Sequence, residues 1–367
     1  MRIVFFLGAG FSRPAGLPVM REFPMFCGSL SDMRLEIECF FKCVEYAQRT
    51  RAYIHGDIQN VEYLMSVLSL AAIANPDLTF EMSTGRITVE KALSHIQTLV
   101  WRVYSRMESY ASRQDSYRHF RRALECLLKT MSNSIKIDIV TTNYDMLPEM
   151  LMLAIGVPTS SPIAYEVLPA TPASDPPNFC KSLSPGLYGN SAACTVHKLH
   201  GSVNYFVKSA GKRKELHCWD QLFVRETNGP LFSIPFACHQ DATIPKGFLP
   251  VIVPPSMVKH YDIPIVRQIW ANASNAIAEA DKIIFVGYSF PPSDTIMKFF
   301  LGTSLTNNHS GCRIAVIDPD ADTVATSMKD IFVPDMAAHV EFIRYPLQDV
   351  CSKHFQQWTE LVGWLQK

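Results

Sequence analysis

Two short polar segments could supply the groups for acid–base chemistry. TTNYDMLPE, residues 141–149, follows an apolar run and places Asn143 and Asp145 two residues apart. KLHGS, residues 198–202, follows another apolar run and places His200 before a glycine. A histidine at such a place is a candidate general base, because its ordinary pKa lies in the working range. The structural alternatives are a turn former for Asn143, a helix N-cap for Asp145 and a purely structural histidine.

The opening stretch MRIVFFLGAGFSRPAGLP predicts a turn shaped for the close approach of a phosphate. Its apolar run ends in Gly8 and Gly10, with Ser12 just beyond. Glycine permits a tight turn, and a helix start after it offers N–H groups to an anion. The dinucleotide fingerprint GxGxxG is not matched, because Arg13 stands where the third glycine belongs. On these residues alone, a bare turn is as good an interpretation as a phosphate site.

Two further apolar runs end in residues that suit a nucleotide. FVGYSF, residues 285–290, ends in Gly287 and Ser289. VIDPD, residues 316–320, contains Asp318, which can accept a hydrogen bond from a ribose or an adenine edge. Each segment is a weak signal by itself. Their joint occurrence after successive apolar runs indicates a single crevice.

The elements that must position these residues are buried strands. Six runs are apolar nearly throughout, at residues 2–8, 137–143, 195–201, 282–288, 313–318 and 340–345. Such runs suit strands that are buried on both faces of a parallel sheet. The sequence therefore predicts an α/β fold with an open parallel sheet of Rossmann type. Ligands of such sheets bind at the carboxyl ends of the strands.

We divide the chain into three parts. A Rossmann-like domain is expected from residues 1–18 and 136–367, with a helical module inserted at 19–135. Apolar residues recur in that insert at three- and four-residue steps, which is typical of helices. Residues 148–264 contain fifteen of the 24 prolines and are expected to form a loop-rich cover over the site.

Composition excludes several classes of protein. The 34 basic and 34 acidic residues give a formal net charge of zero, which argues against direct, sequence-specific nucleic-acid binding. No apolar run is long enough for a membrane span and no signal peptide is evident, so we expect a cytoplasmic protein. The ten cysteines form no CxxC pair, which favours reduced thiols and no structural metal.

Taken together, the segments resemble the motif series of the sirtuins and their bacterial relatives. The matching segments are GAGFS, AGLPVMR, TTNYDML, LHGS, VGYSF and VIDPD, where sirtuins carry GAGxS, GIPxFR, TQNxDxL, HG, GTS and an adenine-contacting stretch. The resemblance extends from residue 5 to about residue 320, with long insertions between its parts. It implies a Rossmann-like fold without hydride transfer, in which NAD is consumed.

The resemblance also implies roles for individual residues. Asn143 and Asp145 match the pair that holds the nicotinamide ribose and the carboxamide end, and His200 matches the catalytic base. The other implied NAD-binding positions run from the pyrophosphate turn to the adenine region, and are Gly8, Ala9, Gly10, Ser12, Arg21, Thr142, Gly287, Ser289 and Asp318.

Departures from the sirtuin pattern put a protein substrate in doubt. Deacylases carry two CxxC pairs of a zinc ribbon after the histidine, whereas this chain has Cys218 and Cys238 twenty residues apart. Thr142 and Met20 replace the glutamine and phenylalanine that lie where nicotinamide leaves. This pattern is similar to the zinc-free sirtuin-like proteins of bacterial anti-phage systems, which hydrolyse NAD. Residues 54–68 are similar to an Asn/Glu-bearing helix of that group.

We therefore expect an NAD glycohydrolase that cleaves NAD, its substrate, to nicotinamide and ADP-ribose without a metal. It would be the NAD-depleting effector of a bacterial anti-phage defence system. The resemblance implies a homo-oligomer and a separate protein partner, such as a ring-forming translocase ATPase. The alternatives are an NAD-dependent protein deacylase, an ADP-ribosyl transferase, and a non-catalytic sensor of NAD or ADP-ribose. Asn143 and His200 argue against the sensor, which needs neither.

Overall fold

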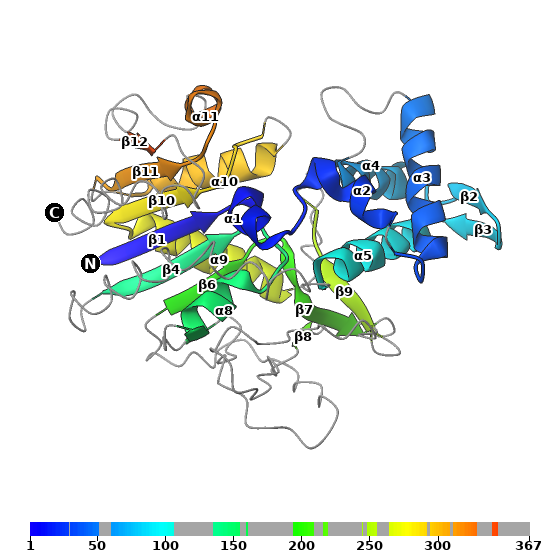
Figure 1. Ribbon diagram of the computed structural model, residues 1–367, viewed down its shortest axis with the longest axis horizontal. Coiled ribbons are helices and arrows are strands. Elements are labelled where there is room, and N and C mark those ends of the chain that lie inside the picture. Colours follow the sequence, from blue (N-terminus) through cyan, green and yellow to red (C-terminus); the bar gives the residue numbers. More distant parts are fainter. Residues whose placement is uncertain are drawn as a thin grey trace, which may run out of the picture.

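The fold consists of a parallel sheet with its helices, a helical module beside one end of that sheet, and a small antiparallel sheet between the two (Figure 1). It is seen in a computed structural model that describes residues 1–28, 30–50, 60–105, 135–154, 159–160, 194–208, 216–218, 244, 248–254, 264–291, 294–308, 311–328 and 340–343.

The main sheet has seven strands in the order β12-β11-β10-β1-β4-β6-β5, and every neighbouring pair is parallel. The strands are β1 (Arg2–Leu7), β4 (Lys136–Thr141), β5 (Thr159–Ser160), β6 (Cys194–Lys198), β10 (Lys282–Val286), β11 (Arg313–Ile317) and β12 (Val340–Ile343). All six predicted runs are strands of this sheet, and the predicted α/β class is confirmed. The strands β1, β4, β6, β10 and β11 each end before the predicted end of their run, so the polar residues that follow them lie in loops.

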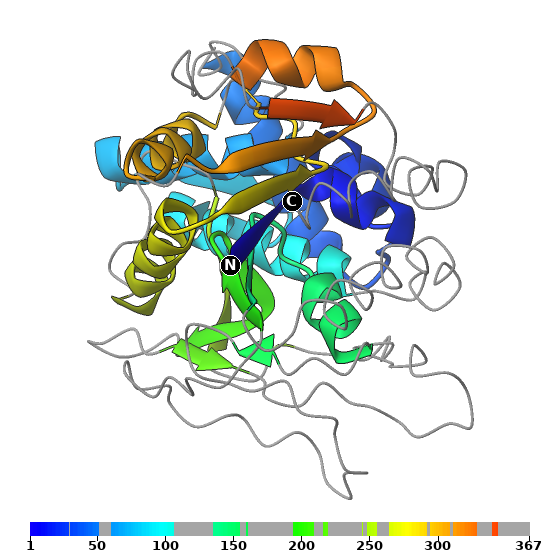
Figure 2. The ribbon, with the colours of Figure 1, turned by 90° about the vertical axis from the view of Figure 1, so that its left-hand side faces the viewer.

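The strand order is that of a doubly wound sheet. The chain passes from β1 outward to β4 and β6, then crosses back so that β10, β11 and β12 extend the other side. Helices α9 (Pro264–Ala278) and α10 (Thr295–Thr306) lie on one face and α8 (Leu147–Ala154) on the other, with α11 (Ala321–Met328) beside β12 (Figure 2). The order reverses between β1 and β10, which is where such sheets bind ligands.

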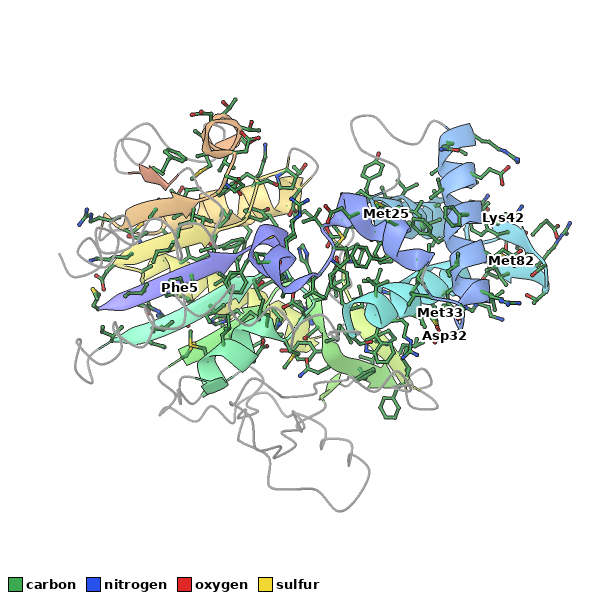
Figure 3. All side chains as sticks on the ribbon, viewed as in Figure 1. Phe5, Met25, Asp32, Met33, Lys42 and Met82 are labelled. Carbon is green, nitrogen blue, oxygen red and sulfur yellow. The ribbon has the colours of Figure 1, made fainter. Side chains whose placement is uncertain are left out.

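Burial on both faces explains why these strands are apolar nearly throughout. From Ile3 to Leu7 every residue of β1 is buried, and side chains fill the space between the sheet and its helices (Figure 3). Asp138 in β4 is a buried exception. Its carboxylate lies 2.8 Å from both His197 Nε2 and Arg2 Nε. Burial opposes ionisation, but these two hydrogen bonds outweigh it and lower the pKa of Asp138.

The helical module contains α2 (Phe23–Cys27), α3 (Arg34–Arg49), α4 (Val61–Ala74) and α5 (Val89–Ser105). Both α3 and α4 pack on α5. An antiparallel hairpin, β2 (Thr79–Met82) and β3 (Gly85–Thr88), joins α4 to α5 and was not predicted. Figure 3 places Lys42 and Met82 at the end of the module far from the main sheet.

A three-stranded antiparallel sheet connects the module to the main sheet. Its order is β8-β7-β9, from β7 (Gly201–Lys208), β8 (Leu216–Cys218) and β9 (Phe248–Ile252). Helix α5 is fixed to it by Gln97 Nε2, which donates to the Ile252 carbonyl at 2.9 Å, and by Trp101 Nε1, which donates to the Val203 carbonyl at 2.7 Å. These strands lie in the part predicted to be loop-rich, most of which falls outside the described residues.

The described helices include none that is long and apolar enough to cross a membrane. Five cysteines of the described residues are buried and carry free thiols: Cys27, Cys39, Cys43, Cys194 and Cys312.

The loops that follow β1 and β10 are in direct backbone contact. Gly10 N donates to the Gly287 carbonyl at 2.9 Å, and Gly8 N donates to the Val286 carbonyl at 3.0 Å. Gly287 has a φ of 60°. A Cβ atom on it would lie 2.4 Å from Phe11 N, so only glycine fits this crossing.

We predict that Gly287→Ala destabilises the protein more than Gly311→Ala. Both glycines are in the left-handed region, with φ of 60° and 68°, but a Cβ on Gly311 would meet nothing within 4 Å. Gly311→Ala should cost about 1 kcal/mol of unfolding free energy, from backbone strain alone. The backbone clash should add about 1–3 kcal/mol for Gly287→Ala. Urea unfolding measures both, and equal losses would contradict a tight loop crossing.

Candidate functional site

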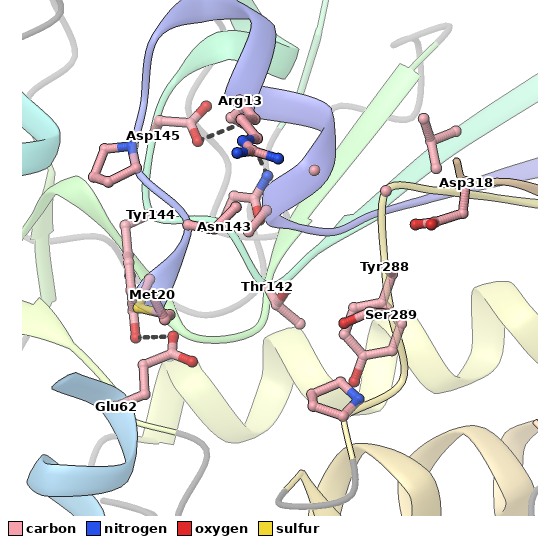
Figure 4. A pocket seen from close by; sticks show the side chains of 18 of the residues that line it. Arg13, Met20, Glu62, Thr142, Asn143, Tyr144, Asp145, Tyr288, Ser289 and Asp318 are labelled. Atoms are coloured by element: carbon pink, nitrogen blue, oxygen red, sulfur yellow. Dashed lines mark hydrogen bonds between the residues drawn. The ribbon is translucent and has the colours of Figure 1, made fainter. Parts of the chain in front are cut away.

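A cavity of about 830 Å³ lies at the carboxyl ends of β1, β4, β10 and β11 (Figure 4). Its wall is completed by the turn after β6 and, from the helical module, by Asn60 and Glu62 at the start of α4 and Tyr104 of α5. A volume of this size is typical of small-molecule and cofactor sites. The cavity therefore occupies the place in the sheet where a dinucleotide is expected.

The structure brings most of the predicted site residues to this one cavity. Ten line it: Ala9, Gly10, Ser12, Thr142, Asn143, Asp145, His200, Gly287, Ser289 and Asp318. Gly8 lies behind them and contributes its carbonyl to the framework. Arg21 belongs to the short helix η2 (Met20–Glu22), and its side chain lies outside the described residues.

Asn143 is held rigidly by the loop that follows β1. Its Nδ2 donates to the Gly8 carbonyl at 2.8 Å and to Ser12 Oγ at 2.9 Å, and its backbone N donates to Thr141 Oγ1 at 3.0 Å. Both amide hydrogens are thereby engaged. The Oδ1 atom is left as the group with which Asn143 can accept a hydrogen bond from a ligand.

Asp145 is fully buried and both of its carboxylate oxygens have protein donors. Ser12 Oγ donates to Oδ2 at 2.7 Å, and the backbone N of Leu147 donates to Oδ1 at 2.9 Å. The second bond is that of an N-terminal cap for α8, which is the structural alternative considered for this residue. Each oxygen of Asp145 is thus already engaged by one protein donor, and the geometry favours a positioning role over the catalytic one that was predicted.

Behind this loop lies a buried ion pair between Lys198 of β6 and Glu149 of α8, with Nζ and Oε2 3.3 Å apart. Lys198 Nζ also donates to the Asp145 carbonyl. Burial raises the pKa of Glu149 even beside this cation. The pair fixes the loop after β4 from the side opposite the cavity wall of α4.

His200 occupies the turn between β6 and β7. The predicted strand at 195–201 is interrupted here because Gly201 takes a φ of 84°. The His200 side chain is 1% exposed, yet within the described part of the chain neither ring nitrogen has a hydrogen-bond partner. Its ring lies between those of Trp270 and Tyr144, with both centroid distances 6.4 Å. Leaving a buried polar group unpaired is costly, and such groups concentrate at functional sites.

Sequence reasoning did not assign a role to Glu62 or Tyr144. Tyr144 Oη donates to Glu62 Oε1 at 2.7 Å, and the same oxygen lies 3.8 Å from His200 Nδ1. Burial, followed by the charge of Glu62, raises the pKa of Tyr144 well above its usual range, so the phenol remains a donor. The start of α4 could be predicted from the sequence, because Asn60 is a typical N-cap residue. In the structure its Oδ1 accepts a hydrogen bond from the backbone N of Glu62. That Glu62 reaches the histidine follows only from the tertiary fold.

Further acidic side chains line the cavity. Tyr288 Oη donates to Asp294 Oδ2 at 3.0 Å, and the Asp320 backbone N donates to Asp318 Oδ1 at 2.9 Å. Burial raises the pKa of Asp318. Among the described lining residues the basic side chain is Arg13, which is 56% exposed and pairs with Glu22 at 2.7 Å.

The turn after β1 offers fewer amides to an anion than its sequence predicts. Gly8 N and Gly10 N donate to carbonyls of the β10 loop, and Phe11 N donates to the Gly8 carbonyl at 2.9 Å. The helix that follows, α1 (Ala9–Ser12), is a single turn. The glycines therefore serve first the contact between two loops, and Arg13 is the described side chain placed to meet a phosphate.

The described residues contain no group of three or more His, Cys, Asp or Glu side chains arranged to hold a metal ion.

Comparison with known proteins finds likeness at the level of solved structures. The chain matches no protein-family model and no curated protein. It is similar to a mutant Sir2 homologue in complex with ADP-ribose, over 99% of this chain and 93% of that one, at 12% identity and a TM-score of 0.42. It is also similar to Sir2Tm bound to a propionylated peptide, over 97% and 92% of the two chains, at 12% identity and a TM-score of 0.38.

The described site can accept hydrogen bonds through Asn143, accept a proton through His200 and place negative charge around a cationic ligand. The positions of Asn143 and Asp145 depend on Ser12. Its hydroxyl accepts a hydrogen bond from Asn143 and donates one to Asp145.

We predict that Ser12→Ala costs about 1–3 kcal/mol of unfolding free energy, because it leaves two buried polar partners unsatisfied. Ser69→Ala is a matched control: Ser69 is also buried, but its hydroxyl only donates to the Met65 carbonyl four residues earlier in α4. That bond is dispensable in a helix, so the control should change stability by less than about 0.5 kcal/mol. Chemical unfolding measures both, and similar values would show that Ser12 does not connect the loops.

Proposed function

We propose that the cavity binds NAD as a substrate and cleaves it to nicotinamide and ADP-ribose. The observation that carries this proposal is His200, a buried imidazole whose ring nitrogens have no partner among the described residues, at a cavity whose wall includes the fixed amide of Asn143. The cavity lies where a doubly wound sheet reverses its strand order, the usual place for a dinucleotide.

The charges of the cavity suit the two ends of NAD differently. The nicotinamide ring is cationic, and the ribose carbon C1′ gains positive charge as the bond to nicotinamide breaks. Carboxylates such as Glu62 line the cavity near His200 and would favour that charge. Arg13 would meet the pyrophosphate at the more exposed side. The adenosine ribose would then lie toward Ser289 and Asp318.

The reaction needs a base and an ordered water. When the bond between C1′ and the nicotinamide nitrogen breaks, its electron pair goes to that nitrogen and nicotinamide leaves neutral, so no acid is required. Asn143 Oδ1 would accept from a ribose hydroxyl and hold the sugar. Water then adds to C1′ and its proton passes to His200 and on to solvent, giving ADP-ribose. Base catalysis of this kind contributes roughly 10²–10⁴ in rate.

The wider biology stays a proposal that rests on the resemblance of the motif series. It comprises NAD depletion in a bacterial anti-phage system, a cytoplasmic homo-oligomer, and control by a separate partner such as a ring-forming ATPase.

The test is an NAD cleavage assay on the purified chain, with nicotinamide and ADP-ribose separated by chromatography. We expect His200→Ala and Asn143→Ala each to lower kcat by at least about 100-fold, because they remove the base and the ribose acceptor. Asn272→Ala and His95→Ala are matched controls outside the cavity lining and should keep wild-type rates.

Two results would contradict the proposal. One is a wild-type chain that binds NAD but releases no nicotinamide under any condition tried. The other is an acyl-lysine peptide that is required for turnover and yields acylated ADP-ribose, which would establish the deacylase instead. Unchanged nicotinamide release in the His200→Ala and Asn143→Ala variants would mean that the site is wrong or that a contaminating activity is at work.

A further inference from the structure

Glu62, at the start of helix α4 in the helical module, places its carboxylate next to the imidazole of His200, which follows strand β6 of the main sheet. We propose that Glu62 is a positioning residue for His200: it orients the ring and stabilises the imidazolium that forms when His200 takes a proton. This inference rests on the proposed function for its chemistry, while the Glu62–His200 pair itself can be tested without turnover.

The contact has the geometry that such a role requires. Glu62 Oε1 lies 3.8 Å from His200 Nδ1, a separation that a small movement of either side chain would shorten to a hydrogen bond when Nδ1 carries the ring proton and Nε2 is the acceptor. With Nδ1 directed at a carboxylate, Nε2 is the nitrogen left to face substrate or water. A buried imidazole oriented by a carboxylate on one side, and reacting on the other, is a common arrangement of catalytic bases.

Glu62 is itself held in place. Tyr144 Oη donates to it at 2.7 Å, and Tyr144 is buried against Tyr104 of α5, with ring centroids 5.6 Å apart. The Tyr144 carbonyl accepts from Val203 N at 2.9 Å in β7, next to the turn that holds His200. One tyrosine therefore connects the module, the loop after β4 and the turn of the histidine.

The neighbouring acids are already engaged in other contacts. Both oxygens of Asp145 accept from Ser12 and Leu147, and Asp294 accepts from Tyr288 and from the start of α10. The titratable groups around His200 in the described wall are Glu62 on α4, Tyr104 on α5, Tyr144 and Asp145 after β4, and Tyr288 and Asp294 before α10. Burial raises the pKa of each of the three tyrosines, so they stay neutral and Glu62 is the charge nearest the ring.

The activity test is Glu62→Gln, which keeps an acceptor for Tyr144 and removes the charge. We expect kcat to fall about 10–100-fold with little change in KM, because the charge matters most when His200 is protonated. Without the carboxylate, neutral imidazole persists to lower pH, so the acid limb of kcat/KM against pH should move to lower pH. Glu45→Gln, on the exposed surface of α3, is the matched control and should match the wild type.

A double-mutant cycle with Tyr144→Phe tests the tether. The phenylalanine keeps the ring and removes the hydroxyl, so it should lower kcat less than Glu62→Gln. The double variant should be no slower than Glu62→Gln alone, because the two residues act as one unit. Fully additive losses, or a Glu62→Gln variant with wild-type kcat and pH profile, would overturn the inference.

A readout independent of turnover separates this inference from the proposed function. The titration of His200 is followed by NMR of histidine-labelled protein, with His200→Ala to assign the signal. In Glu62→Gln the midpoint should fall relative to the wild type, because a neighbouring carboxylate favours the protonated ring. If the wild type never cleaves NAD yet the midpoint shifts, the proposed function fails and the pair stands. An unshifted midpoint overturns the pair, whether or not NAD is cleaved.

Discussion

One hydrogen-bonded chain holds the two central loops of the site in place. It runs from the Gly8 carbonyl through Asn143 and Ser12 to Asp145, and it ends at the cap of α8. Each member donates or accepts in a low-dielectric setting, where breaking one bond strands the next group. This series of hydrogen bonds depends on the position of the loop after β1. That loop lies directly on the loop after β10, at a crossing where only glycine fits. The reactive-looking polar residues of the sequence are therefore mostly framework. His200 differs from them, because its ring nitrogens have no hydrogen-bond partner among the described residues.

The helical module is part of the site and not an appendage to it. Glu62 and Asn60 complete the cavity wall, and Tyr104 closes it from α5. The module is fixed to the main body through buried side-chain bonds from Gln97 and Trp101 to backbone carbonyls of β9 and β7. A displacement of α4 would withdraw the carboxylate from His200 while leaving the sheet untouched. The surroundings of His200 are in this way coupled to the packing of a segment distant in sequence.

The sheet was predictable because burial on both faces imposes a continuous apolar pattern, and the six runs are its strands. The convergence of ten predicted residues on one cavity follows from the same rule, since carboxyl ends of parallel strands share an edge. The sequence could not show which polar groups are already hydrogen-bonded to other parts of the protein. Asp145 looked reactive, and its saturation by Ser12 and Leu147 depends on loops that meet only in the fold. The amides of Gly8 and Gly10 looked free and are engaged by the β10 loop, because Gly287 approaches so closely. Glu62 reaches His200 through a contact 138 residues apart in sequence, which no local pattern encodes.

The balance of charges bears on why such a site would favour hydrolysis. A cavity lined by several carboxylates and, among the described residues, by one partly exposed arginine holds a doubly anionic pyrophosphate less firmly than a cationic ring. Its preference is for positive charge, and that charge passes from the nicotinamide ring to the ribose as nicotinamide leaves neutral, so carboxylates beside C1′ would favour the transition state over the bound ground state. Binding would then be modest and the transition state comparatively favoured, which is the condition for turnover and not for tight sensing. The His200 imidazole supports the same preference, because burying a ring whose nitrogens have no hydrogen-bond partner among the described residues is costly and such groups concentrate at functional sites.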